Sequence, residues 1–334
     1  MRKFIYILAL IFAVGCGDTS KPEKNINTVT GPINPSEMGI TLIHEHVLVD
    51  FIGADSTGYH RWNRDSVVEK MVPYFLEAKD QGVETVIETT PMFLGRDVEI
   101  LKRLSRRTGI NFITNTGLYG AVNDKYLPEY AFILNADSLS QMWISEFTGG
   151  IENTEIKPGF MKISVDPDSI LSRVDEKIVR AAIMTHLQTG MTIVSHTGPD
   201  QPAFRQLELL KEMGVSPAAW VWTHAQNGTD EGRLKAAQSG AWISLDNIME
   251  DNYTNYVEMI EALNSAGLLH RVLISHDAGY YDPDAVNGGE IRGYTALFTH
   301  LIPALKEKGY SQEQIDQLLI KNPKKAYTIS IRKE

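Results

Sequence analysis

Short apolar runs alternate with longer segments of helical periodicity from residue 40 onward, and this alternation restricts the fold more than any other feature of the chain. Such alternation is typical of βα units that build a parallel sheet. Eight strands and their helices over about 290 residues fit a closed (β/α)₈ TIM barrel better than an open doubly wound sheet. The eight runs are Ile40–Val49, Val83–Thr89, Asn111–Leu118, Phe160–Val165, Thr192–Ser195, Ala219–Thr223, Trp242–Leu245 and Arg271–Ser275.

The helical segments between these runs carry repeated stop signals. Four of them are followed directly by glycine, which commonly ends a helix. The segment Tyr126–Ile156 is long for one connection and predicts one or two additional helices. Because no linker or change of composition follows Pro35, we expect one catalytic domain over residues 36–334. The four helices are Asp65–Gln81, Asp97–Thr108, Asp175–Thr189 and Gln201–Met213.

The N-terminus has the pattern of a processing signal. Arg2 and Lys3 precede an apolar run, Phe4–Val14, that is too short to cross a bilayer as a helix. The run leads into Ala13-Val14-Gly15-Cys16, which resembles a bacterial lipobox, although Ala13 stands where leucine is commonest. We therefore expect residues 1–16 to be a lipoprotein signal peptide with Cys16 acylated. An ordinary secretory signal is the alternative.

These features predict a protein anchored by lipid to the bacterial cell envelope, in the periplasm or on the cell surface. Residues 17–35 are polar and suit a flexible tether between Cys16 and the domain. The formal net charge is −10, so a basic groove for nucleic acid is not expected. The expected partners are the membrane and a small-molecule substrate, and the sequence leaves a homodimer open.

Two histidines stand at the end of the first apolar run. In an extended strand His44 and His46 point to the same face, whereas Glu45 points away. Two imidazoles directed at one point can hold a metal ion, although a strand end with two hydrogen-bonded surface histidines has the same pattern. The other strands decide between these readings, because TIM barrels place functional residues at the C-terminal ends of their strands. Those ends supply Lys162, His196, His224 and Asp277.

This set of residues resembles the phosphotriesterase family of the amidohydrolase superfamily. The resemblance extends from about Gly39 to Tyr327, and its motifs occur in order at the expected strand ends. They are Thr41-Leu42-Ile43-His44-Glu45-His46, Gly95-Arg96-Asp97, Thr116-Gly117-Leu118-Tyr119, Gly159 to Lys162, Ser195-His196-Thr197-Gly198, His224 with Thr229-Asp230, and Leu273-Ile274-Ser275-His276-Asp277.

The resemblance implies a metal-dependent hydrolase with two divalent metal ions. It assigns His44, His46 and Asp277 to the more buried ion and His196 and His224 to the more exposed one. Zinc suits such ligands, and manganese, cobalt or iron are also accepted. Asp277 is implied to act as the general base, taking the proton of a hydroxide that bridges the metals.

Lys162 is implied to bridge both metals as an N-carboxylated lysine. An ammonium group cannot bind a cation, so a lysine among four histidines must be deprotonated or converted to an anionic carbamate. The alternative is a neutral or ion-paired lysine of the core.

Other residues are expected around the substrate. The family places a pocket tyrosine at Tyr119, which would donate to a substrate oxygen or simply pack in the wall. The aromatic and acidic loop Ala278–Asp284 would roof the pocket with Tyr281. Its acidic edge disfavours strongly anionic substrates, although Arg292 could reverse this locally. After His224 the chain reads Ala225-Gln226-Asn227-Gly228, where many members carry aspartate.

The remaining polar candidates receive structural roles. Glu88 is expected to support a metal-binding histidine rather than to enter the pocket. His276 faces away from the site by strand alternation. The other histidines fit no strand end and are interpreted as surface or packing residues: His60, His186, His270 and His300.

The sequence thus predicts a binuclear hydrolase that cleaves a lactone or other carboxylic ester, with phosphotriester cleavage as a secondary activity. Two alternatives remain open. One is a non-catalytic, metal-containing lipoprotein that captures a small ligand. The other is a mononuclear amidohydrolase that uses only the inner metal ion.

Overall fold

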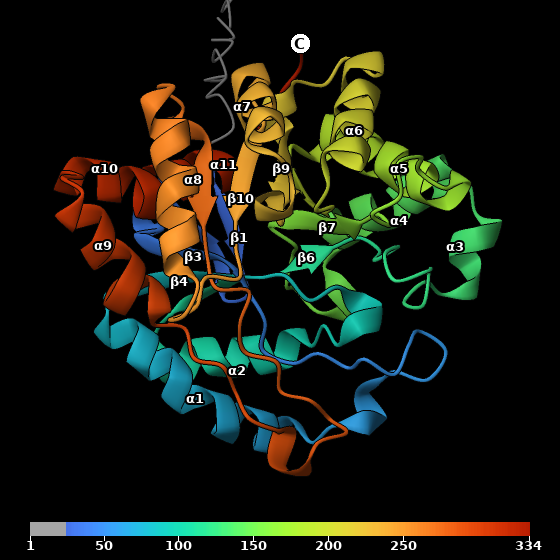
Figure 1. Cartoon of the computed structure of the whole chain (residues 1–334). Helices are drawn as coiled ribbons and strands as arrows, with labels where there is room; N and C mark the ends of the chain where they lie inside the picture. Colours follow the sequence, from blue (N-terminus) through green and yellow to red (C-terminus); the bar gives the residue numbers. More distant parts are fainter. Residues whose placement is uncertain (1–24) are drawn as a thin grey trace, which may run out of the picture.

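The computed structural model describes residues 25–334, and these residues form a (β/α)₈ barrel, as the sequence predicts (Figure 1). The third barrel position is split at Thr114 into two short strands, and all other positions hold one strand. The strands are parallel to their neighbours. In order they are β3 (Ile40–Glu45), β4 (Val83–Glu88), β5 (Asn111–Ile113) with β6 (Asn115–Thr116), β7 (Phe160–Ser164), β8 (Thr192–His196), β9 (Trp220–Thr223), β10 (Trp242–Leu245) and β11 (Val272–Ile274).

The barrel is closed between its last and first strands. The backbone N–H of Asp277 donates to the carbonyl oxygen of His44 at 2.9 Å, and the N–H of His46 donates to the carbonyl of Ala278 at 2.9 Å. Both bonds lie just beyond β11, where the chain passes alongside the end of β3. The closure therefore fixes two expected metal-binding segments against each other.

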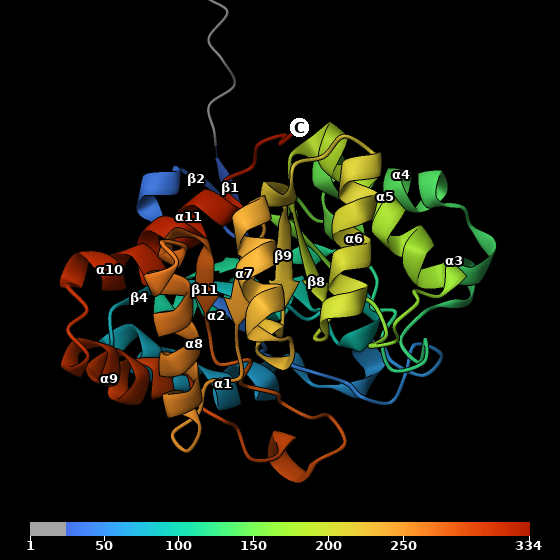
Figure 2. The ribbon, with the colours of Figure 1, turned by 45° about the horizontal axis from the view of Figure 1, so that its top comes forward.

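The helices cover the outside of the barrel (Figure 2). The four expected helices are present within a few residues of their expected bounds, and Gly109 and Gly190 end two of them in the left-handed conformation that glycine favours (φ 70° and 76°). Two additional helices, α3 (Glu129–Ile133) and α4 (Ala136–Gly149), lie in the long connection as expected. The others are α1 (Arg64–Asp80), α2 (Val98–Thr108), α5 (Arg173–Thr189), α6 (Asp200–Glu212), α7 (Asp230–Ser239), α8 (Tyr253–Ser265), α9 (Ile302–Glu307), α10 (Gln312–Asp316) and α11 (Asn322–Tyr327).

The expected tether is wrong for residues 25–35. β1 (Ile26–Thr28) and β2 (Gly31–Ile33) form an antiparallel hairpin that belongs to the domain. The physical reason is Ile26, which is fully buried and joins a cluster with Phe160 and Tyr327 at the N-terminal end of the barrel. Because residues 17–35 are polar on average, the composition of this segment did not reveal that Ile26 packs in the core. The proposed signal peptide, Cys16 and residues 17–24 lie outside the described residues.

Apolar side chains fill the barrel interior. Ile43, Val194, Val221 and Leu273 come from different strands and share one buried cluster. A larger core lies between the strands and the helices. Within residues 25–334, no helix combines the length and the apolar character needed to cross a membrane.

Candidate metal centre

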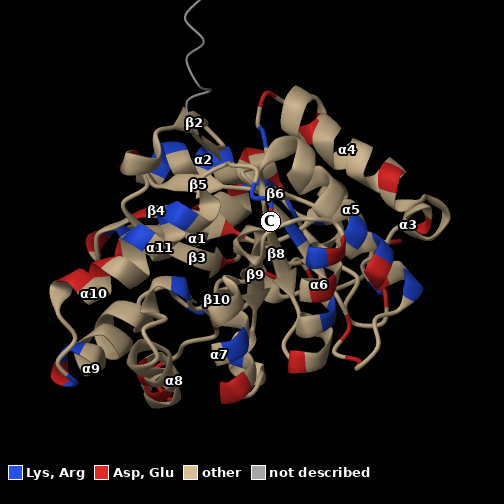
Figure 3. Ribbon diagram, turned by 90° about the horizontal axis from the view of Figure 1, so that it is seen from above, with Lys and Arg blue, Asp and Glu red and all other residues tan. Residues whose placement is uncertain are grey.

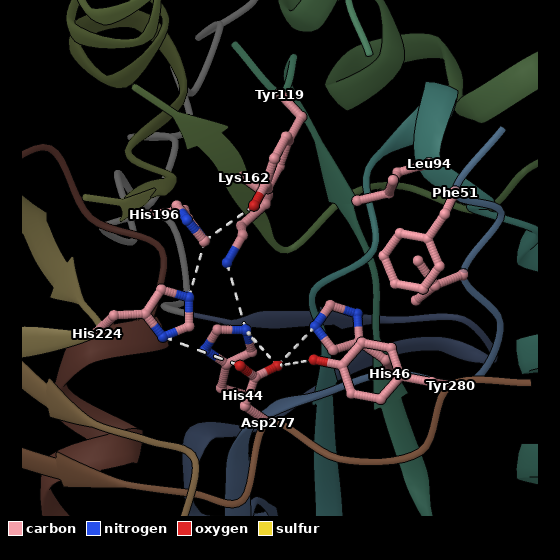
Figure 4. Close-up of a pocket in the computed structure, with 11 residues that line it drawn as sticks. His44, His46, Phe51, Leu94, Tyr119, Lys162, His196, His224, Asp277 and Tyr280 are labelled. Atoms are coloured by element: carbon pink, nitrogen blue, oxygen red, sulfur yellow. Dashed lines mark hydrogen bonds and ion pairs between the residues drawn. The ribbon is translucent and has the colours of Figure 1, made fainter. Parts of the chain in front are cut away.

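The cavity at the C-terminal ends of the strands contains every metal ligand expected from the sequence (Figure 4). Its volume is about 320 Å³. One part of its wall is polar and ionisable, and the rest is apolar or aromatic. It is lined by His44, His46, Val49, Phe51, Leu94, Tyr119, Lys162, His196, His224, Asp277 and Tyr280.

The imidazoles and the carboxylate converge in two groups. His46 Nε2 lies 3.1 Å and His44 Nε2 lies 3.5 Å from Oδ1 of Asp277. On the other side, His224 Nε2 lies 2.8 Å from His196 Nδ1. One ligand atom from each of His44, His224 and Asp277 can be chosen so that all three lie within 4.8 Å of one another. Such a set of nitrogen and oxygen donors suits a divalent transition metal.

Two of these ligands have unusual backbone conformations. His224 and Asp277 adopt left-handed backbone angles, with φ of 60° and 51°. Such angles are uncommon for residues other than glycine and occur often at functional sites. His224 directly follows β9 and Asp277 lies three residues beyond β11, and both side chains line the cavity.

The outward nitrogens of three histidines are held by other side chains. His44 Nδ1 lies 3.0 Å from Oδ2 of Asp246, and His224 Nδ1 is hydrogen-bonded to Oδ1 of the same carboxylate. His46 Nδ1 lies 2.8 Å from the hydroxyl of Thr90. With these nitrogens engaged, each ring directs its Nε2 toward the cavity, as metal-binding histidines commonly do.

Asp246 is the functional residue that the sequence interpretation missed. Its carboxylate is fully buried and orients two ligands from different strands. Burial favours the neutral acid, but the imidazoles of His224 and His44 outweigh this effect and hold its pKa well below the usual range. A signal was present in the sequence, because Asp246 directly follows the buried run Trp242–Leu245, the one strand end to which no chemical role was assigned.

Lys162 is buried at the bottom of the cavity. Its side chain is 1% exposed, and its Nζ lies 3.5 Å from His44 Nε2. No carboxylate of residues 25–334 lies within 4.0 Å of this amine. Burial lowers the pKa of Lys162 to about 8, against the opposing influence of Asp277. An ion-paired core lysine is therefore not observed among residues 25–334, and an amine that loses its proton more readily than an ordinary lysine fits a group that reacts with carbon dioxide.

Two of the four histidines, His44 and His196, are predominantly neutral, which leaves their lone pairs free for a metal. Burial, aided by the charge of Lys162, lowers the pKa of His44 to about 4, and burial with the neighbouring His224 lowers that of His196 well below its ordinary value. Burial alone would raise the pKa of Asp277, but His44 and His46 hold it well below the usual range. His44, His196 and Asp277 are thus in the protonation states that metal binding requires. At His224 the carboxylate of Asp246 outweighs burial and raises the pKa, so a metal that binds there displaces a proton.

A model of the phosphotriesterase family matches residues 24–327. The chain belongs to the phosphotriesterase family. It is 32% identical over 292 residues to the phosphotriesterase homology protein of Escherichia coli (strain K12), covering 85% of this chain and 96% of that protein. It is 29% identical to an aryldialkylphosphatase of Saccharolobus solfataricus, covering 89% and 97% of the two chains, and 23% identical to an N-acetyltaurine hydrolase of Xenopus tropicalis, covering 92% and 99%.

Membership of the phosphotriesterase family identifies the protein as a metal-dependent hydrolase, and the family is binuclear. The residues fit two metal ions, because the convergent donors include a buried lysine with no carboxylate partner in addition to four imidazoles. Glu88 supports the site indirectly: it accepts a hydrogen bond from Thr90, which in turn contacts His46. His276 is buried away from the cavity and bonds Glu45 at 2.7 Å. Both arrangements agree with the sequence interpretation.

Two of the residues expected at the substrate, Tyr281 and Arg292, are not among those that line this cavity. Tyr281 packs in the core against Gly288, and its neighbour Tyr280 lines the cavity, with its ring stacked on His46 at 4.8 Å. The backbone of Tyr280 is left-handed (φ 71°). This turn directs Tyr280, rather than Tyr281, into the cavity. Arg292 does not line the cavity. Its guanidinium donates to the backbone carbonyls of His276 and Asp277 and to Asn247 Oδ1, so it braces the turn that carries the ligand.

Asp246→Asn is expected to weaken metal binding in this family member by about 10- to 100-fold. One amide oxygen can accept from only one of the two histidine N–H groups, and the amide NH₂ would face the other. Metal affinity measured by competition with a chelator tests this. Asp65→Asn is the matched control, since that exposed carboxylate pairs with Arg103 at the surface. Equal affinity of the Asp246 variant and the control would contradict the orienting role.

Proposed function

We propose that the protein hydrolyses a neutral lactone or other carboxylic ester with two bound divalent metal ions. One observation carries this proposal. A buried lysine without an acidic partner lies where four imidazoles and one carboxylate converge, beneath a cavity whose remaining wall is apolar or aromatic.

In this proposal His44, His46 and Asp277 hold one metal ion, and His196 and His224 hold the other. Lys162, carboxylated on Nζ, would supply one oxygen to each ion. When bound, the two ions would make a water molecule more acidic and polarise the ester carbonyl. Zinc suits this set of imidazole and carboxylate donors, and manganese, cobalt or iron would also be accepted.

Asp277 and Tyr119 have separate tasks in the proposed reaction. Asp277 is ionised and lies at the junction of the ligand groups, so it can take the proton of the attacking water and pass it to the leaving oxygen. The hydroxyl of Tyr119 lies 2.9 Å from His196 Nδ1. Burial, reinforced by the charge of Asp277, raises the pKa of Tyr119, which stays protonated and can donate to a substrate oxygen.

The cavity wall favours a neutral substrate with an apolar group. Val49, Phe51 and Leu94 form its apolar side, and Lys162 is the only cationic side chain among the lining residues. A substrate with a free phosphate or sulfonate would find no arginine or exposed lysine there. The relatives named aryldialkylphosphatase and N-acetyltaurine hydrolase show that the family acts on different bonds, so substrate choice depends on this wall.

A substrate panel tests the proposal. With metal supplied, we expect kcat/KM for an alkyl-substituted lactone or an aryl carboxylic ester to exceed that for an aryl dialkyl phosphate or an anionic N-acyl compound by about 100-fold. Such a ratio corresponds to about 3 kcal/mol of transition-state discrimination. Efficient turnover of the phosphotriester alone would overturn the proposed substrate class. No turnover at all by the metal-loaded protein would favour the ligand-binding alternative.

We also propose that Cys16 carries the lipid that anchors the protein to the cell envelope. Support comes from the sequence Ala13-Val14-Gly15-Cys16 after a short apolar run. The mass of the mature protein tests this. An N-terminal acylated Cys16 is expected, and a mature chain that begins elsewhere, without acyl groups, would contradict it.

A further inference from the structure

The opposite end of the barrel carries a second cavity, which we call the floor groove. Its volume is about 540 Å³, and no acidic side chain is among its lining residues. It lies over α11 and the segment that follows. It is lined by Pro35, Lys321, Lys324, Lys325, Thr328, Ser330 and Arg332.

The positive charges of the floor groove are largely unneutralised. Lys321 pairs with Glu313 at 3.1 Å. Among the described residues, no carboxylate lies within 4.0 Å of the charged nitrogens of Lys324, Lys325 or Arg332. This local excess of positive charge, in a chain with a net charge of −10, would attract an anionic partner.

Arg332 is held rigidly at the base of the groove. Its guanidinium donates to the carbonyls of Ala326 and Thr328 at 3.0 and 2.9 Å, and to the hydroxyl of Thr192 at 3.1 Å. These acceptors are neutral, so its charge is oriented without being cancelled. The lysines on α11 are exposed beside it, and Figure 3 shows them on the side of the molecule that carries the C-terminus.

The floor groove and the metal centre are at opposite ends of the same strand. Thr192 begins β8 and contacts Arg332, whereas His196 ends β8 and lines the catalytic cavity. Four residues of extended strand separate them by about 13 Å. A surface bound at the floor therefore leaves the catalytic cavity open to the solvent.

The N-terminal segment enters the domain beside this groove. The carbonyl of Asn25 accepts a hydrogen bond from the N–H of Ile329 at 3.2 Å, between the groove residues Thr328 and Ser330. Figure 2 shows the start of β1 on the same side as α11. From Cys16 to Asn25 the chain can extend at most about 32 Å. A lipid on Cys16 would thus keep this end of the barrel near the bilayer.

We propose that the floor groove binds the anionic headgroups of the phospholipid surface to which the chain is tethered, and so orients the barrel with its catalytic cavity away from the membrane. Nucleic acid is the less suitable polyanion, because the acidic remainder of the surface would repel a long polymer. The proposed lipid tether and this groove act on the same end of the molecule.

Vesicle binding by the unlipidated chain from Gly17 onward tests the proposal without the anchor. This chain includes all described residues and hence the entire closed barrel and its core. The probes are vesicles with about 30% phosphatidylglycerol in phosphatidylcholine and vesicles of phosphatidylcholine alone. We expect binding only to the anionic vesicles, weakening strongly as salt rises from about 0.05 M to about 0.3 M.

The variant carrying Lys324→Glu and Lys325→Glu is expected to bind anionic vesicles at least about 25-fold more weakly, since each lysine near such a surface contributes about fivefold. The matched control carries Lys125→Glu and Arg173→Glu, which make the same charge change at the opposite end of the barrel. Both variants should keep the Tm of the parent, and the groove variant should also keep its esterase rate.

Three results would overturn the proposal. The first is equal binding to neutral and anionic vesicles, and the second is equal loss of binding in both double variants. The third is binding of inorganic phosphate or of an oligonucleotide at the groove without binding of vesicles. None of these results depends on the substrate of the metal centre, so the proposed hydrolase could fail its own test while this one succeeds.

Discussion

Lys162→Ala is expected to lower kcat/KM by about a thousandfold or more and to lower the metal content of the purified protein. Loss of a group that only supports a metal ligand costs about 10- to 100-fold, and Lys162 is proposed to bind both metals directly. Lys162 is buried, and among residues 25–334 no carboxylate lies within 4.0 Å of its amine to balance a charge. Rates and metal content, measured on protein expressed with bicarbonate, test this prediction.

A second substitution separates metal binding from packing. Lys162→Met keeps an unbranched apolar side chain in the barrel interior and removes only the amine, so it should preserve stability better than alanine while losing as much activity. Millimolar acetate or propionate should restore part of the rate to Lys162→Ala, because a small carboxylate can enter the space and supply the two missing oxygens. Full activity in the methionine variant would show that Lys162 is a structural residue.

Asp277→Asn is expected to lower kcat by about 10²- to 10⁴-fold, the usual contribution of a positioned general base. The amide is close to the carboxylate in shape but cannot take a proton. The pKa of Asp277 is already held low by His44 and His46, so the carboxylate is ionised across the working range of the enzyme. The pH dependence of kcat should therefore show no step from this group near neutrality.

The control for Asp277 is metal content. Asp277→Asn retains an oxygen donor, and five other proposed ligands are unchanged, so it should keep more metal than Lys162→Ala does. A variant that is fully loaded and fully active would mean that another group accepts the proton. Tyr280 would not be that group, because its hydroxyl donates to Asp277 Oδ1 and burial raises its pKa.

The barrel and the ligands could be predicted from the sequence because both follow from short-range rules. Strand alternation alone directs His44 and His46 to one side, and a closed parallel barrel brings the ends of all strands to one rim. The motif resemblance then assigned Lys162 and Asp277. Each of these residues lines the observed cavity.

The failures occurred where backbone geometry departs from regular strands or where a contact spans a long distance in the chain. Tyr280 replaces Tyr281 in the cavity because the chain turns through left-handed angles after β11. Ile26 belongs to the core through contacts with side chains more than one hundred residues away, such as Phe160. Arg292 satisfies carbonyl groups of a turn whose conformation no local pattern specified. Asp246 directly follows a strand run, but it was missed because no local spacing rule marks a carboxylate that holds two histidines from different strands.

Metal stoichiometry of the intact barrel tests the central claim most directly. Elemental analysis of the protein after gentle purification, expressed with bicarbonate, should give about two divalent metal ions per chain, as expected for a two-metal hydrolytic site. The same analysis of Lys162→Ala should give one or none. A single metal ion in both proteins would contradict the bridged centre and support the mononuclear alternative, and no metal in either would show that the four histidines, Lys162 and Asp277 do not assemble the proposed site.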